Sequence, residues 1–117
     1  MTEHDPRWMY RQMIDAMVVC CSGPGQVSAE RIRVGVWNEN AAADDVPQTA
    51  LNRLVTSLDA DQREALAIVL AEEFASGMFN ALEVLQAAQL TPFEVGYEGD
   101  PSDDFLGRLD GWEWPVA

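Results

Sequence analysis

The chain has 117 residues, of which 20 are acidic and 7 are basic, so its formal net charge is −13. This length suffices for one domain around a single core, and an apolar fraction of 48% is typical of a folded protein rather than a disordered segment. The negative charge argues against binding nucleic acid or an anionic membrane surface, and no basic leader or long apolar run predicts export or membrane insertion, so we expect a cytoplasmic protein.

The first predicted helix covers residues 6–21. Asp5-Pro6 is a typical helix start, because aspartate caps the first turn and proline is tolerated at the first helical position. Most of the segment that follows is apolar on nearly every side. A helix of this kind belongs either at the centre of a core or in an interface, and one interface open to it is a homodimer through helix 6–21.

Residues 29–38 are ambiguous between helix and strand. The turn sequence 22–25 separates them from the first helix. Ile32, Val34 and Val36 alternate with other residues as in a strand, yet the segment also carries apolar residues at helical spacing. A lone strand would have no partner elsewhere in the chain, so we predict a helix over 29–38.

Three further helices are predicted in the middle of the chain, over residues 46–58, 60–75 and 78–90. The first has a single apolar stripe, and Asp59 with Gln62 forms a capping-box signature at the start of the second. Ser76-Gly77 interrupts the apolar pattern. The sequence therefore predicts two helices here, or one long helix that is kinked at the glycine.

The last predicted helix covers residues 101–110, and an extended tail follows it. Ordering eight tail residues costs on the order of 8 to 16 kcal/mol of backbone entropy, whereas burying one large apolar side chain returns about 1.5 to 3 kcal/mol. Trp112 and Trp114 would therefore need help from the last helix to hold the tail down. We predict an all-α fold, a compact bundle of five or six helices in one domain over 1–117, with the tail packed on it.

The groups that catalysis or metal binding requires are scarce. His4 is the only histidine and the chain has no lysine, which leaves no zinc signature or Schiff-base chemistry, and a serine triad or Cys-His pair would have to use His4. The adjacent Cys20 and Cys21 fit no metal or disulfide spacing and are interpreted as packing residues. A calcium loop beginning at Asp100 fails because Phe105 stands where glycine is needed. We predict no catalytic residue, cofactor or metal.

The C-terminal segment is the candidate interaction surface. Tryptophan is enriched at the energetic centres of protein interfaces, and here acidic residues surround it. The candidate residues are Asp103, Asp104, Arg108, Trp112, Glu113 and Trp114. The competing interpretation is that both indoles close the protein's own core, since tryptophan is usually largely buried.

Three motifs resemble a family of small bacterial proteins of unknown function. They are Tyr10-Arg11-x-Met13-Ile14-Asp15, Asp61-Gln62-Arg63-Glu64-x-Leu66-Ala67 and Asp103-Asp104-Phe105-x-x-Arg108-Leu109-x-Gly111-Trp112-Glu113-Trp114-Pro115. The resemblance covers nearly the whole chain, and the tail is its most specific part. It implies an uncharacterised domain without an assigned activity, so it assigns no role to any residue.

The composition favours a non-enzymatic protein that acts through protein contacts. The first hypothesis is an acidic interaction domain, for example of the immunity or antitoxin kind, that covers a basic surface on another protein. The second is a self-associating structural domain, based on the apolar first helix. The third, which we favour least, is a carboxylate-based hydrolase or metal binder.

Overall fold

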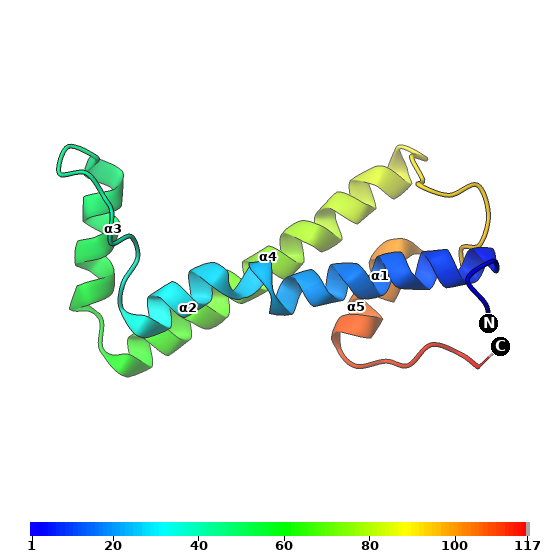
Figure 1. Cartoon of the computed structure of the whole chain (residues 1–117), viewed down its shortest axis with the longest axis horizontal. Helices are drawn as coiled ribbons and strands as arrows, with labels where there is room; N and C mark the ends of the chain where they lie inside the picture. Colours follow the sequence, from blue (N-terminus) through cyan, green and yellow to red (C-terminus); the bar gives the residue numbers. More distant parts are fainter. Residues whose placement is uncertain (117) are drawn as a thin grey trace. The chain divides into compact units, whose positions relative to one another are not determined.

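The computed structural model describes residues 1–116, and the secondary structure in that range is entirely helical (Figure 1). The all-α prediction is confirmed. The elements are α1 (Pro6–Ser22), the short 3₁₀ helix η1 (Pro24–Gln26), α2 (Val27–Val34), α3 (Val46–Ser57), α4 (Ala60–Ala87) and α5 (Pro101–Leu109). The described residues form two compact units, a first unit of residues 1–22 with 75 onward and a second unit of residues 23–74. A single domain over 1–117 stays a prediction.

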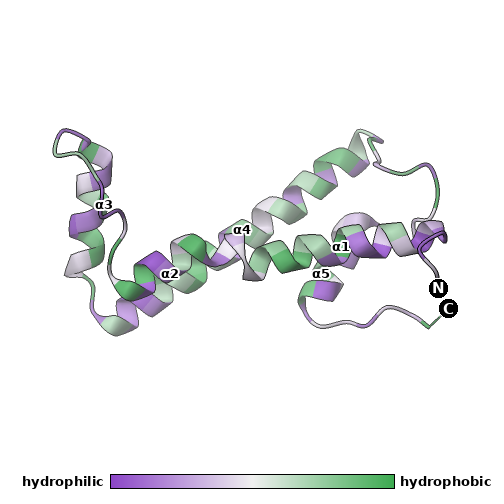
Figure 2. Ribbon diagram, viewed as in Figure 1, coloured by the Kyte–Doolittle hydropathy of each residue, from purple (hydrophilic) through white to green (hydrophobic). Residues whose placement is uncertain are grey.

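The core of the first unit is built by α1, α5 and the second half of α4. Tyr10 and Ile14, one turn apart on α1, are completely buried, as is Phe105 of α5. Leu82 of α4 is 6% exposed and belongs to the same cluster. Each such side chain contributes about 1.5 to 3 kcal/mol by leaving water. The apolar middle of α1, visible in Figure 2, thus serves its own unit's core, one of the two roles predicted for this helix.

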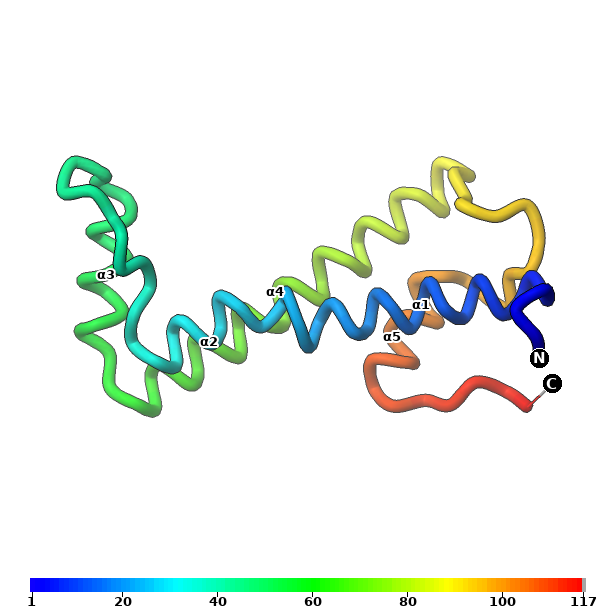
Figure 3. Tube along the Cα trace, viewed as in Figure 1, coloured from blue at the N-terminus to red at the C-terminus, as the bar shows by residue number. Residues whose placement is uncertain are grey.

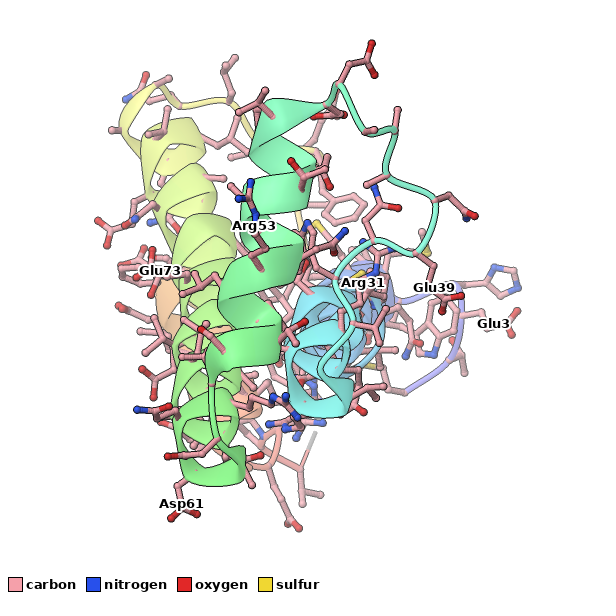
Figure 4. The ribbon with its side chains drawn as sticks, turned by 90° about the vertical axis from the view of Figure 1, so that its left-hand side faces the viewer. Glu3, Arg31, Glu39, Arg53, Asp61 and Glu73 are labelled. Atoms are coloured by element: carbon pink, nitrogen blue, oxygen red, sulfur yellow. The ribbon has the colours of Figure 1, made fainter. Side chains whose placement is uncertain are left out.

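The second unit packs α2 and α3 with the first half of α4. Its buried cluster is small and consists of Ala29, Ile32, Val55 and Ala67. The predicted capping box is confirmed at the start of α4: the Gln62 N–H donates to Asp59 Oδ1 at 2.8 Å, and the Asp59 N–H donates to Gln62 Oε1 at 3.0 Å. Figure 4 views this unit with side chains, and its labels Arg31, Arg53 and Glu73 lie on α2, α3 and α4 respectively.

The helix predicted over 29–38 is present but lies earlier in the chain. α2 ends at Val34, because Gly35 adopts a left-handed conformation with φ of +88° and its N–H donates to the carbonyls of Arg31 and Ile32. A Cβ at Gly35 would lie 2.8 Å from the guanidinium of Arg63. Glycine therefore ends this helix where apolar spacing alone predicted that it continues.

The two helices predicted over 60–75 and 78–90 are one continuous helix, α4. The prediction of two helices separated at Ser76-Gly77 is wrong, and of the two alternatives one long helix is the one observed, so fewer helices form than the six predicted ranges. Residues 75, 78, 79 and 82 pack on the first unit's core at helical spacing, and a glycine within a helix costs only about 1 kcal/mol relative to alanine. Packing on both sides of the glycine therefore outweighs its low helix propensity.

Substituting Gly77→Ala is expected to stabilise the protein by about 0.5 to 1 kcal/mol. Gly77 is exposed, and a Cβ built on it has open space within 4 Å. The change therefore adds helix propensity without a clash. Urea unfolding followed by circular dichroism measures it. Ala81→Gly, at another exposed position of α4, should destabilise by a similar amount. A destabilised Gly77→Ala variant would contradict a continuous α4.

Among the described residues, α4 is the helix long and apolar enough to cross a membrane on length and composition alone, with a mean hydropathy of 1.4 in its best window. One such helix is weak evidence, since a helix of a soluble protein can pass the same test, although only 11% of this stretch is buried. Glu72 and Glu73 lie near its middle, where carboxylates are costly in hydrocarbon. We therefore keep the prediction that the chain does not bind membranes.

Candidate functional site

The tail is attached to α1 through Trp114. Its indole Nε1 lies 3.2 and 3.1 Å from the two carboxylate oxygens of Asp15, and Arg108 Nε of α5 donates to Asp15 Oδ1 at 2.7 Å. One carboxylate on α1 thus holds both α5 and the tail. Figure 3 shows the tail running back beside α1 toward its N-terminal end.

Two guanidinium groups flank the Trp114 ring. The Cζ atoms of Arg11 and Arg108 lie 5.2 and 5.6 Å from the ring centroid, within the range of a cation–π interaction. Arg11 also donates to the Pro115 carbonyl at 2.9 Å and forms a two-bond ion pair with Glu98. The part-buried Trp114 ring additionally meets the Tyr10 ring edge-on at 5.9 Å. The tail is therefore anchored by aromatic, cationic and backbone contacts together.

Trp112 is displayed rather than packed. It is 42% exposed, with its ring centroid 5.2 Å from that of Trp114. Its carbonyl accepts a hydrogen bond from Arg108 Nη1 at 2.5 Å. Gly107 lies under the ring, where an added Cβ would make an ordinary contact of 3.5 Å. The two interpretations of the tail are thus divided between the two indoles: Trp114 closes the core and Trp112 faces solvent.

An acidic depression lies beside the displayed indole. It has a volume of about 540 Å³ and is lined by Asp103, Asp104, Gly107, Asp110, Gly111 and Trp112. Three of the six candidate residues, Asp103, Asp104 and Trp112, meet here. Arg108 and Trp114 are instead engaged with Asp15, and Glu113 is exposed outside this lining. A surface of carboxylates beside an indole face suits a cation.

Asp104 also takes part in a part-buried hydrogen bond. The Tyr10 hydroxyl donates to its carboxylate, and the Gly99 carbonyl lies 3.4 Å from the same hydroxyl. Burial, then the bond to Asp104, raises the pKa of Tyr10 above its ordinary value. Burial likewise raises the pKa of Asp104, opposed by the hydrogen bond from Tyr10 and reinforced by the charges of Glu98, Asp103 and Asp100. The ionised Asp104 is thus held in an environment that disfavours its charge.

Asp104→Asn is expected to raise the free energy of unfolding at pH 7. A carboxyl whose pKa is higher in the folded than in the unfolded state contributes stability that is fully present below its unfolded pKa and is lost as pH rises through the folded pKa. The ordinary value is 3.8, so the advantage of Asp104→Asn should shrink as pH falls toward that value. Its amide oxygen can still accept from Tyr10.

Urea unfolding at several pH values between 4 and 7 measures this difference. Asp44→Asn, in an exposed loop of the second unit, is the charge-matched control and should show a smaller, flatter effect. A stability gain for Asp104→Asn that is constant over this pH range would contradict the raised pKa of Asp104.

Sequence reasoning missed the partners on α1 and in the loop before α5. Arg11 and Asp15 are charged residues four apart on a largely apolar helix, a signal that a shared partner lies against that face. Glu98 carried no signal of its own. Residues of the first and third motifs contact one another, through Tyr10 with Asp104 and Asp15 with Arg108. Within residues 1–116 no group of three or more metal-ligating side chains is found.

Comparison with known proteins places nearly the whole chain in one family model. The model matches residues 3–116, and its description is a family of unknown function (DUF6547). No curated protein and no solved structure matches the chain significantly. The predicted resemblance to an uncharacterised family is confirmed, while the tail motif as its signature stays a prediction. The site's chemistry is therefore argued from its own residues.

Proposed function

This chain belongs to DUF6547, a family of unknown function, and we propose that it is a non-enzymatic interaction domain that binds a basic segment of another protein. The observation that carries the proposal is the acidic depression beside the exposed face of Trp112. An arginine of the partner would stack on the indole while its guanidinium meets the carboxylates. Immunity proteins and antitoxins are examples of domains that would act in this way, covering a basic partner protein in the cytoplasm.

Two features of the chain support this use of the depression. The net charge of −13 steers a basic partner toward the protein at low salt. The contacts of Trp114 and Arg108 with Asp15 hold the segment that carries Trp112 in place, so little ordering entropy is lost when the indole is covered. Acidic charge and a pre-ordered aromatic group together favour specific binding over general attraction.

The test titrates the full chain with a hexa-arginine peptide and follows tryptophan fluorescence at low and moderate salt. We expect binding that weakens as salt rises. The variant Asp103→Asn/Asp110→Asn should weaken binding about tenfold, because two carboxylates of the depression are neutralised. Asp44→Asn/Asp61→Asn changes the net charge equally at exposed positions of the second unit and is the matched control.

The control separates a site from the general field of the protein. If both double variants lower the affinity for the hexa-arginine peptide equally, binding follows net charge alone and the acidic depression is not the site. Trp112→Ala should also lower the peptide affinity, whereas Glu113→Gln, outside the lining, should leave this affinity nearly unchanged. An unchanged affinity for Trp112→Ala would remove the indole from the proposed surface.

Self-association is a second candidate function, and exposed apolar side chains of the first unit favour it. Val19 of α1 is 64% exposed and Val84 of α4 is 67% exposed. Association of two copies could cover such exposed side chains. Light scattering over a range of concentrations measures the molar mass of the full chain. A strict monomer at high concentration would remove this candidate, including the homodimer through residues 6–21.

A further inference from the structure

The first unit contains an apolar pocket separate from the acidic depression. Its volume is about 330 Å³, and no residue lines both cavities. Four segments build it: α1, the C-terminal part of α4, the chain between α4 and α5, and the first residue of α5. The lining residues are Met13, Met17, Leu82, Leu85, Gln86, Leu90, Thr91, Pro92 and Pro101.

Helical spacing explains how the walls are made. Met13 and Met17 are one turn apart on α1, so both point to the same side, and Leu82, Leu85 and Gln86 share one side of α4 in the same way. Beyond α4 the backbone turns sharply at Gln89, which has φ of +58°. Leu90, Thr91 and Pro92 follow and line the pocket together with Pro101 at the start of α5.

Two polar side chains, Gln86 and Thr91, line the pocket. Gln86 Oε1 accepts the Ser102 N–H at 2.6 Å, which fixes the Gln86 side chain at the start of α5. Within residues 1–116 no hydrogen bond is found for the Gln86 amide nitrogen or the Thr91 hydroxyl. Both groups can donate to a guest. The lining contains no charged residue.

We propose that this pocket binds an uncharged, mainly apolar small molecule with a hydrogen-bond acceptor at one end. Ligand pockets of this size are lined by apolar side chains with a few polar groups that orient the ligand. At about 30 Å³ for each water-sized group, the space holds about ten non-hydrogen atoms. A charged head group is disfavoured because burial without a partner charge is costly, and the strongly acidic chain repels anions in particular.

Methyl NMR on the full chain, with methionine methyl groups labelled, tests the proposal using 1-octanol as the probe. The five methionines report on different places, since Met13 and Met17 line the pocket while Met1 and Met9 do not. We expect the Met13 and Met17 signals to shift saturably with 1-octanol. Octanoate has the same apolar length but carries a carboxylate, and we expect its affinity to be at least about tenfold lower.

Two adjacent substitutions locate the site. Leu85→Glu introduces a charge into the lining and should lower the affinity for 1-octanol at least about tenfold. Val84→Glu, exposed and outside the lining, should leave this affinity nearly unchanged. Thr91→Val keeps the side-chain shape and should lower the affinity for 1-octanol, because the hydroxyl donor is removed. The proposal is overturned if 1-octanol causes no saturable shift at Met13 and Met17, if octanoate binds equally well, or if both glutamate variants behave alike.

Discussion

Replacing Trp114 with alanine is expected to destabilise the protein by about 3 kcal/mol, whereas replacing Trp112 should cost less than about 1 kcal/mol. Trp114 packs on the first unit's core, donates to Asp15 and lies between two guanidinium groups. Trp112 is 42% exposed. Its removal uncovers Gly107 and loses the edge-on contact with Trp114, whereas removal of Trp114 breaks the contacts that join the tail to α1.

Urea unfolding of the two alanine variants beside the wild type measures this difference, and acrylamide quenching of fluorescence gives an independent check. The chain has four tryptophans, so quenching is compared between the variants: loss of Trp112 should lower the readily quenched part of the fluorescence, whereas loss of Trp114 should not, because the Trp112 indole faces solvent. Trp114→Phe is the conservative control and should recover part of the stability through retained packing. Equal destabilisation by the two alanine variants would mean that both indoles close the core, and the acidic depression would lose its aromatic wall.

The second large effect is expected for Asp15→Ala, which should cost about 2 kcal/mol. The side chains of Asp15 and Arg108 are 33% and 26% exposed, so their ion pair lies between a solvated pair worth at most about 1 kcal/mol and a buried pair whose disruption costs 3 to 5 kcal/mol. The same substitution removes the acceptor of the Trp114 indole. Arg108 and the indole N–H would then both lack their partner on α1.

A double-mutant cycle with Asp15→Ala and Arg108→Ala measures the coupling directly by urea unfolding. We expect the two changes together to cost clearly less than the sum of the single changes. Arg7→Ala, which breaks the exposed pair with Asp5 but keeps Asp5 as the cap of α1, is the control and should leave unfolding nearly unchanged. Additive effects of Asp15→Ala and Arg108→Ala would show that the carboxylate does not join α5 to α1.

These two predictions also bear on the proposed function. If Asp15 holds the tail, Asp15→Ala should lower the affinity for the hexa-arginine peptide although Asp15 does not line the acidic depression. The expected cause is a less ordered Trp112, whose ordering entropy would then oppose binding. A destabilised Asp15→Ala variant with unchanged peptide affinity would separate the anchoring of the tail from recognition.

The sequence by itself determined the local features of this protein. Apolar periodicity and the absence of partner strands identified an all-α chain, and Asp59 with Gln62 marked the start of α4, because these signals depend on residues within one or two turns. The scarcity of histidine and lysine likewise limits chemistry whatever the fold. The sequence identified only part of the candidate site: it named Asp103, Asp104 and Trp112 but not the residues of α1 that hold this segment in place.

Tertiary structure decided the rest, since those outcomes depend on contacts between distant residues. Packing on either side of Gly77 keeps α4 continuous against a propensity cost of about 1 kcal/mol. Trp112 and Trp114 have the same local pattern, but Trp114 meets distant residues of α1, among them Asp15, 99 residues before it, and is part-buried, whereas Trp112 is exposed. Local spacing can show which side chains share a face, but the surface that meets that face is chosen by the whole fold.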